Sequence, residues 1–458
     1  MATFSMNEAE AQDVTIKKAV PVLLFLFVLC LVIDNSFKII SVDMAKDFGI
    51  SATTVSWQST LAGLVIGIGA VVYAALADSI SIRRLLSIGI ILICAGSLMG
   101  YLFQHSFTLV VIARIIQTAG LASAETLYVI YVTKHLPQNE QKKFLGFSTS
   151  SYALSLVIGS LAGGFISTYL HWTSLFLVAL ITIVLLPFIL KYLPKENGKG
   201  GYVDVIGLFL VGVIAAFLML YISNFNWLYL LVFIVAILLF LAYISKNSKS
   251  FIDIAFFKNK RFVSILAVAF VIYSVQLAYI FLFPFLLENI YGLKLDTISL
   301  LLIPAYVLSA TVGALSGKIA QFLGSKQSII FAMAGITVSV LLGGFFVQSS
   351  VVVFVISMIL FSSSFALMYA PMIDSCVSTI SKEHSGTAVG FYNLVLNVAA
   401  SIGIAYTAAM MDSSSMKNNF LGYIHLANAS LYSNILLILS LISVFSLVVY
   451  WGLVGRKK

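Results

Sequence analysis

Residues 108–133 have the sequence TLVVIARIIQTAGLASAETLYVIYVT, an apolar stretch long enough to cross a membrane that nevertheless contains two charges. Arg114 and Glu125 are eleven positions apart. At ~100° per residue this separation is three turns plus about 20°, so in a helix both side chains lie on nearly one stripe. A charge at mid-bilayer costs roughly 2.5–3.5 kcal/mol on insertion scales, and such residues usually face a bundle interior or a water-filled cavity. We therefore expect the rest of the chain to form a scaffold around this face.

The composition is that of a polytopic membrane protein. Of the 458 residues, 61% are hydrophobic and only 9% are charged, which no soluble domain of this size matches. The three cysteines, Cys30, Cys94 and Cys376, lie in or beside apolar stretches and have no disulfide or zinc-site spacing. We therefore predict an all-α integral membrane protein, with no metal and no organic cofactor.

Fourteen apolar spans follow one another along the chain. They are residues 19–41, 57–77, 85–103, 108–133, 145–168, 172–193, 204–223, 227–245, 262–287, 298–320, 327–347, 350–373, 387–411 and 430–454. If the connections alternate between the two sides, 21 of the 26 Lys and Arg residues fall on one side and three (Lys46, Lys294 and Lys417) on the other. Because basic residues mark the cytoplasmic side, both termini are predicted to be cytoplasmic. The net charge of +9 then reflects topology, and no nucleic-acid partner is needed.

Two basic, polar connections divide the spans as six, two and six. The predicted division is 1–18, a cytoplasmic N-terminal tail; 19–193, an N-terminal six-helix bundle; 194–203, a cytoplasmic linker; 204–245, two inserted helices; 246–261, a cytoplasmic loop with a short amphipathic piece; and 262–458, a C-terminal six-helix bundle with a short basic tail. Such a division is expected where a fold repeats itself within one chain.

Related sequences recur at the same place in both halves. AALADSISIRR at 74–84 follows the second span, and GKIAQFLGSK at 317–326 follows the tenth, which suggests an internal repeat. The overlapping segment GALSGK at 313–318 has a superficial likeness to a phosphate loop, but its spacing is one residue short and Ile319 stands where Ser or Thr is needed. We predict no nucleotide site, so uphill transport would have to use an ion gradient.

These segments resemble signatures of the major facilitator superfamily. Residues 74–84 resemble its loop 2–3 signature G-x-L-a-D-r-x-G-r-[KR], and RIIQTAG at 114–120 resembles its helix 4 signature R-x-x-Q-G-x-G, which the family assigns to proton coupling. SLVIGSLAGG at 155–164 resembles the helix 5 antiporter signature G-x-x-x-G-P-x-x-G-G, with Gly159, Gly163 and Gly164 in place. With fourteen spans, the chain is most similar to the drug:proton antiporter branch, and within it to tetracycline and multidrug efflux proteins of Gram-positive bacteria (classes K and L and their chromosomal relatives).

The resemblance implies two six-helix bundles with two inserted central helices, in a bacterial cytoplasmic membrane. It implies a transporter and not an enzyme, whose partners are protons, a small amphipathic drug and the lipid bilayer, and we expect a monomer. The sequence departs from the signatures at four positions: Ala74 and Ser81 replace loop glycines, Thr118 replaces a glycine of helix 4, and Ser160 replaces the antiporter proline. The last change removes a proline kink from that helix.

Asp34 in the first span is the expected partner of Arg114. Both lie seven to eight residues from the outer end of their predicted spans, so an ion pair between the two helices would satisfy both charges. A proton arriving on Asp34 would break such a pair. The alternative is a permanent structural ion pair. Lys38, one turn further out, is close enough to the surface to extend its ammonium to water.

Glu125 lies near mid-membrane with no obvious partner on its own helix. A carboxyl group removed from water favours its protonated form, which suits a proton carrier or a group that binds a cationic substrate. The alternative is a hydrogen-bonded structural acid. We interpret Asp374, near the cytoplasmic end of its span, as a helix-end acid.

The second half has almost no charge at mid-membrane but many aromatic and amide side chains. Together with Gln117 of the first half, these are the predicted substrate-binding residues: Tyr273, Gln276, Tyr279, Tyr369, Tyr392, Asn393 and Asn397. Aromatic and amide groups in a cavity suit a large, flat, amphipathic ligand, whereas interhelical hydrogen bonding is the alternative for each.

The sequence therefore predicts a proton-coupled antiporter that exports amphipathic drugs, with tetracycline as the best single substrate. Asp34, Arg114 and Glu125 are predicted to couple protons to the substrate, and the halves to rock about a midplane site. One alternative is an exporter of fatty acids or other lipids, which would use Lys38 and Arg114 on an anionic head group. A less favoured alternative is a non-transporting membrane sensor.

Asp78, Arg83 and Arg84 form the predicted gating group in the loop after the second span. At the end of a helix Asp78 can bind neighbouring helix ends only while the inner gate is closed, so Asp78→Asn should slow transport strongly. Substrate affinity of the purified protein, measured by calorimetry, should change little. A large loss of equilibrium affinity would assign Asp78 to substrate binding instead.

Overall fold

The computed structural model describes residues 2–77, 79–194, 203–247, 250–252, 254–378, 380, 385–425 and 427–452. The described residues form helices and connections only, and they include fourteen helices long and apolar enough to span a membrane, which confirms the predicted fold class. In chain order the helices are α1 Ala2–Ile39, α2 Ser41–Phe48, α3 Ala52–Leu76, α4 Ile82–Leu102, α5 Phe107–His135, α6 Gln138–Tyr169, α7 Ser174–Ala179, η1 Leu180–Leu185, α8 Leu186–Tyr192, α9 Val205–Asn224, α10 Trp227–Lys246, α11 Ile254–Lys258, α12 Lys260–Tyr291, α13 Leu295–Leu323, α14 Ser325–Phe345, α15 Val351–Val377, α16 Ser385–Asp412, η3 Ser414–Lys417 and α17 Ala427–Tyr450.

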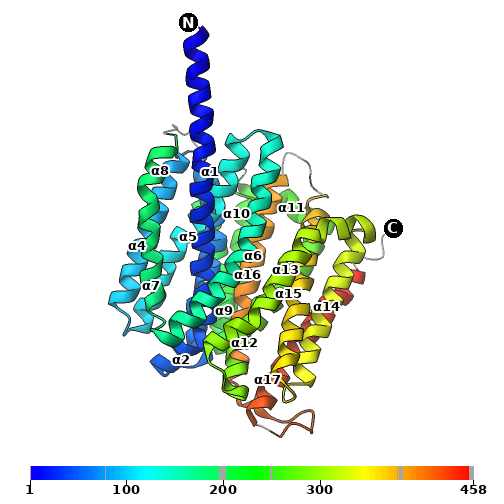
Figure 1. The fold of residues 1–458 in the computed structure, drawn as a ribbon. Helices are drawn as coiled ribbons and strands as arrows, with labels where there is room; N and C mark the ends of the chain where they lie inside the picture. The colour runs from blue at the N-terminus through cyan, green and yellow to red at the C-terminus, as the bar shows by residue number, and fades with distance from the viewer. Residues whose placement is uncertain are drawn as a thin grey trace.

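Two of the fourteen spans differ from a single helix of the predicted length. α1 begins at residue 2, well before the predicted span, and Figure 1 shows it projecting beyond the other helices at its N-terminal end. The sixth span consists of α7, the 3₁₀ segment η1 and α8. The break coincides with Pro187 near the start of α8, which has no N–H to donate to the preceding turn.

The helices pack as two bundles. In the N-terminal bundle the main contacts are α4 with α5, α1 with α6 and α3 with α5; in the C-terminal bundle they are α13 with α15, α14 with α15 and α12 with α16. The bundles meet where α3 packs on α16 and α6 on α13. α9 and α10 pack on each other, and α9 also contacts α16 and α3, so the inserted pair lies beside this junction.

The antiporter-signature glycines are contact points of α6. A Cβ added to Gly159 would lie 2.9 Å from the Val32 carbonyl oxygen, and one added to Gly163 would lie 2.6 Å from that of Ser36, both in α1. A Cβ on Gly164 would lie 2.5 Å from the Leu295 carbonyl oxygen in α13. Small residues allow helix backbones to approach closely in a membrane. Three glycines thus let α6 pack against α1 on one face and against the other bundle on the next.

The sequence segments between the bundles are partly described. Most of the predicted linker 194–203 lies outside the described residues, and within 246–261 the structure contains the short helix α11. Residues 313–318, considered above as a phosphate loop, lie inside α13 and form no loop.

Asp204, a residue that the sequence did not single out, holds the inserted helices to the following loop. It is 2% exposed, and its carboxylate accepts from the Gly207 N–H at 2.9 Å, the Tyr243 hydroxyl at 2.5 Å and the Phe251 N–H at 3.1 Å. It therefore caps α9 and joins it to α10 and to the segment before α11.

We predict that Asp204→Ala lowers the thermal unfolding temperature of the detergent-solubilised protein. The change removes the acceptor of the buried Gly207 N–H and of the Phe251 N–H, and an unsatisfied buried group costs about 1–3 kcal/mol. Asp204→Asn should lower the unfolding temperature less than Asp204→Ala does. Asp374→Ala is the matched control, because Asp374 is exposed and accepts only from Ser325 among the described residues, so a change of about 0.5 kcal/mol or less is expected. Equal losses in both alanine variants would contradict the prediction.

Candidate functional site

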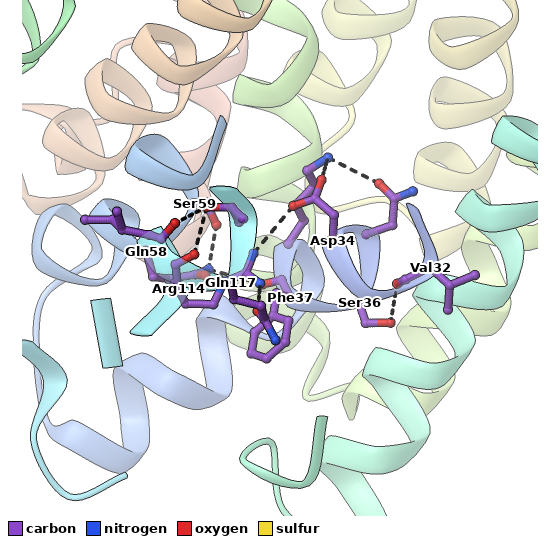
Figure 2. Close-up of polar contacts among 12 residues, drawn as sticks. Val32, Asp34, Ser36, Phe37, Gln58, Ser59, Arg114 and Gln117 are labelled. Carbon is purple, nitrogen blue, oxygen red and sulfur yellow. Dashed lines mark hydrogen bonds and ion pairs between the residues drawn. The ribbon is translucent and has the colours of Figure 1, made fainter. Parts of the chain in front are cut away.

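Asp34 on α1 lies between two cations. Its Oδ2 is 2.6 Å from Lys38 Nζ, four residues further along α1, and its Oδ1 is 3.4 Å from Arg114 Nη2 on α5 (Figure 2). The structure therefore brings Asp34 and Arg114 together at the matching depth that the sequence predicts. It also adds Lys38, the nearer of the two partners. We name Asp34, Lys38 and Arg114 the charge triad.

Arg114 is enclosed by its neighbours. One guanidinium nitrogen donates to Gln117 Oε1, and Cζ lies 4.0 Å from the centre of the Phe37 ring, a cation–π contact. Its side chain is 1% exposed. Gln117 donates in turn to Ser97 on α4 at 2.8 Å. Both ends of the Gln117 amide are thus used inside the N-terminal bundle, where they support Arg114, although the sequence analysis placed Gln117 among the substrate-binding residues.

The sequence suggested that Lys38 extends outward to water. In the structure its side chain folds back along α1 instead. Its ammonium donates to Asn35 Oδ1 at 3.3 Å in addition to its contact with Asp34. Its side chain is 27% exposed, whereas that of Asp34 is 6% exposed. Of the three side chains of the charge triad, that of Lys38 is the most exposed.

Glu125 lies on the same side of the N-terminal bundle. Its Oε1 is buried and has no hydrogen-bond partner among the described residues. It interacts electrostatically with Asp34 and Lys38, and also with Cys30 of α1. An unpaired buried carboxylate costs free energy, so this group is expected either to be protonated or to bind a cation.

Tyr152 on α6 lies between the charge triad and the C-terminal bundle, and the sequence analysis missed it. It is close to Lys38 and Glu125 on its own side and to Tyr273 and Tyr369 of the C-terminal bundle. Tyr152 is 48% exposed and Tyr369 45% exposed, although they belong to facing bundles. We infer that the bundles are apart at this depth. The polar interruption STSSY at 148–152, within a span, was the available signal.

The predicted residues of the C-terminal bundle separate into two groups. Tyr273 and Tyr392 are buried with their hydroxyls close to each other, and Tyr369 donates to Asn393 Oδ1 at 3.4 Å. The exposed pair, Tyr152 of α6 and Tyr369 of α15, forms what we call the tyrosine wall, and Tyr273 and Tyr392 are the buried neighbours of Tyr369.

Two other predicted residues are used within the protein. Tyr279 is fully buried, bonded to Ser357 at 2.8 Å and packed edge-on against Phe361 of α15, so it faces the bundle interior and not a cavity. Asn397 donates to the Asn393 carbonyl and lies against α3 at Gly67. Gln276 is partly exposed. Tyr273 and Tyr279 are six positions apart on α12, about 120° around the helix, so the two side chains point in different directions and do not share one cavity.

The predicted gating residues are only partly described. Asp78 lies outside the described residues, while Arg83 and Arg84 lie in the first turn of α4. Ser81, which replaces a glycine of the family signature, caps this helix by accepting from the Arg84 N–H at 3.4 Å.

The bundles are joined by polar contacts at the end that bears α2, the predicted outer end. Lys46 of α2 pairs with Glu288 of α12, and Tyr169 of α6 donates to Asp296 of α13 at 2.8 Å. In the part of the chain that the structure describes, the hydrogen bonds and ion pairs between the bundles all lie at this end. We name them the outer contacts.

Asp412 makes the most informative outer contact. It is the last residue of α16, where a negative charge opposes its own helix dipole, yet it accepts from the N–H groups of Ala52 and Thr53 at 3.2 and 2.8 Å. It thereby caps α3 of the other bundle. Its position is explained by the partner helix and not by its own.

We predict that Asp412→Ala raises the population of conformations open at the outer end by about tenfold, since a cap and its favourable dipole contact contribute on the order of 1–2 kcal/mol. Distances between spin labels at the outer ends of α3 and α16, measured by pulsed electron resonance, report this population. Ser350→Ala is the matched control, because Ser350 caps α15 at the same end but within one bundle. A similar shift in both variants would show that Asp412 is only a stabilising cap.

Comparisons with known proteins agree with this geometry. The family model described as Major Facilitator Superfamily matches residues 22–204 and 201–404. The riboflavin transporter RibZ of Clostridioides difficile (strain 630) is 22% identical over 384 residues, covering 82% of this chain and 84% of that protein. The quinolone resistance protein NorB of Staphylococcus aureus (strain bovine RF122 / ET3-1) is 25% identical over 413 residues, covering 86% and 85%.

Solved structures share the fold at low identity. The POT family transporter PepTSo aligns with a TM-score of 0.73 at 12% identity, covering 96% of this chain and 98% of that one. The inward-open xylose transporter XylE of E. coli aligns with a TM-score of 0.64 at 15% identity, covering 97% of each chain. With the family model matched across most of its length, the chain belongs to the major facilitator superfamily, and it is a multi-pass membrane transporter.

Proposed function

We propose that the protein is a proton-coupled antiporter that exports amphipathic drugs from the cytoplasm by alternating access. The observation that carries the proposal is Glu125, whose buried oxygen has no partner among the described residues and which lies within electrostatic range of the charge triad. A carboxyl in this setting can exchange a proton for a cationic group. The tyrosine wall, with Tyr152 on one bundle and Tyr369 on the other, supplies aromatic surface for the rest of the molecule.

The charge triad suggests how proton binding is linked to movement. Asp34 holds Lys38 and Arg114 only while it is ionised. Protonation of Asp34 would release both cations at once, and Arg114 would keep only Gln117 and the Phe37 ring. Because α1 leads into α2 through a single residue, a shift of α1 would reach the outer contact of Lys46. Gating by Asp78, Arg83 and Arg84 at the inner end stays part of this proposal.

The energy of one proton is sufficient for useful export. Moving down ~100 mV and one pH unit, a proton yields about 2.3 plus 1.4 kcal/mol, enough for a gradient on the order of 500-fold in a neutral substrate. We propose a monomer in a bacterial cytoplasmic membrane, with both termini in the cytoplasm and the proton gradient as its energy source.

The names of the relatives support a class of substrate. One is named for quinolone resistance and another for riboflavin transport, and both compounds are planar fused-ring molecules. Tetracycline, our best single guess from the sequence, is also a fused-ring amphiphile and stays a prediction. The alternative of fatty-acid or lipid export has one specific observation in its favour, the partly exposed side chain of Lys38.

The test is substrate-induced proton release from energised everted vesicles that contain the protein. Tetracycline, a quinolone, ethidium and a medium-chain fatty acid are added separately. The proposal expects proton release with drugs and none in vesicles without the protein. Release by the fatty acid alone would favour the lipid exporter, and no release by any compound would reject proton-coupled export.

We predict that Glu125→Gln, which mimics the protonated acid, weakens binding of a cationic drug about tenfold and removes most of its pH dependence. In the wild type, affinity for the cation should fall as the pH falls, because the proton and the drug compete for one carboxylate. A neutral drug should be affected less. Affinities are measured by calorimetry at several pH values, with Asp374→Asn as the control acid. Unchanged pH dependence would reduce Glu125 to a structural acid and leave Asp34 as the proton site.

A further inference from the structure

Lys38 has the more exposed side chain of the two cations of the charge triad. The guanidinium of Arg114 is enclosed by Asp34, Gln117 and the Phe37 ring, and its side chain is 1% exposed. The Lys38 side chain is 27% exposed. A lysine ammonium has three N–H groups, and in the described residues Lys38 donates to two acceptors, Asp34 and Asn35. One donor is therefore free for a ligand.

Lys38 and Arg114 compete for the same carboxylate, that of Asp34. Asp34 accepts from Lys38 at 2.6 Å and from Arg114 at 3.4 Å, so one carboxylate serves two cations. If a ligand carboxylate takes Lys38, Asp34 can pair with Arg114 alone. A ligand anion at this point therefore leaves no charge of the triad unpaired, which is the main cost of disturbing a buried ion pair.

The second acid, Glu125, decides which anionic ligands are compatible with exchange. Asp34, Lys38, Arg114 and Glu125 sum to zero when all are ionised, and to +1 when Glu125 is protonated. A purely anionic ligand binds better to the protonated site, so it favours binding together with the proton, which opposes antiport. A ligand that brings its own cation to Glu125 displaces the proton instead.

We propose that the site takes a zwitterionic amphiphile, whose carboxylate binds Lys38, whose ammonium binds Glu125 and whose planar ring system lies along the tyrosine wall. The proposal rests on the proposed function, because it uses exchange at Glu125. In the bound state every charge has one partner: the ligand carboxylate with Lys38, the ligand ammonium with Glu125, and Asp34 with Arg114. The bond changes are exchanges of ion pairs only, and one proton leaves Glu125 for each ligand bound.

Four forms of one quinolone separate the two charges of the ligand. Norfloxacin is a zwitterion, its ethyl ester keeps only the ammonium, its N-acetyl derivative keeps only the carboxylate, and the N-acetyl ester has neither. Binding of each to the full-length protein in lipid nanodiscs is measured by calorimetry. We expect the zwitterion to bind at least ~10-fold more tightly than the ester, as a charged hydrogen bond in a low-dielectric site implies.

Variants then assign this preference to Lys38. Lys38→Met should bring the ratio of zwitterion to ester affinity close to one, while Lys38→Arg should retain most of it. Lys417→Met is the matched control, because Lys417 is exposed in η3 and should keep the wild-type ratio. The proposal is overturned if the wild type binds ester and zwitterion equally, or if Lys38→Met weakens both by the same factor.

The comparison within the wild type decides the question even if Lys38→Met does not fold. Proton release from everted vesicles distinguishes this proposal from the proposed function. If norfloxacin and its ethyl ester give equal proton-linked flux, the zwitterion site is rejected, but the antiporter proposal stands. Absence of proton-linked flux for all four forms would reject the antiporter itself.

Discussion

One buried carboxylate shared by two cations is the constraint on which the rest of the structure depends. Asp34 has 6% of its side chain exposed, and an isolated charge at that depth would be costly. Arg114 meets the same difficulty with 1% exposure, and it needs Gln117, Ser97 behind that residue, and the face of Phe37 to remain in place. The helices α1, α4 and α5 are thus fixed by the need to satisfy two charges. Because the pairing depends on the ionisation of Asp34, the same need makes this part of the bundle sensitive to a proton.

The short helix α2 connects this site to the outer end of the molecule. Only Ile40 separates it from α1. Its Asp43 accepts from Ser167 at 2.5 Å and its Asp47 accepts from Trp172 at 3.0 Å, which ties it to the N-terminal bundle, while Lys46 pairs with Glu288 of the other bundle. The eight-residue helix α2 therefore contacts the N-terminal bundle through two hydrogen bonds and the C-terminal bundle through one ion pair. A change at Asp34 has a direct covalent route to a contact that must break before the outer end can open, so no long pathway through the core is needed.

The fold could be predicted almost completely from the sequence, and the site only in part. The lengths of the apolar stretches and the uneven distribution of Lys and Arg predicted fourteen spans. They could do so because a chain crossing a bilayer must satisfy its backbone hydrogen bonds internally, as a helix does. The depth of Asp34 and Arg114 predicted that they would meet. Depth alone could not give the rotation of each helix, which is why Tyr279 was placed in a cavity although it packs against Phe361. Likewise Asp204 and Asp412 owe their positions to partners far along the chain, Phe251 and Ala52, and no local pattern contains that information.

The change of proline to serine in the antiporter signature acquires a physical meaning in this setting. Ser160 bonds to the Val157 carbonyl at 3.0 Å, and α6 runs unbroken from Gln138 to Tyr169. An unbroken helix keeps Gly159 and Gly163 against α1 and Gly164 against α13 in one rigid element. A proline kink would allow those two contacts to move separately. Under the proposed coupling, a displacement of α1 on proton binding would be passed through α6 to the other bundle as a movement of the whole helix, so that the charge triad and the bundle junction would respond together.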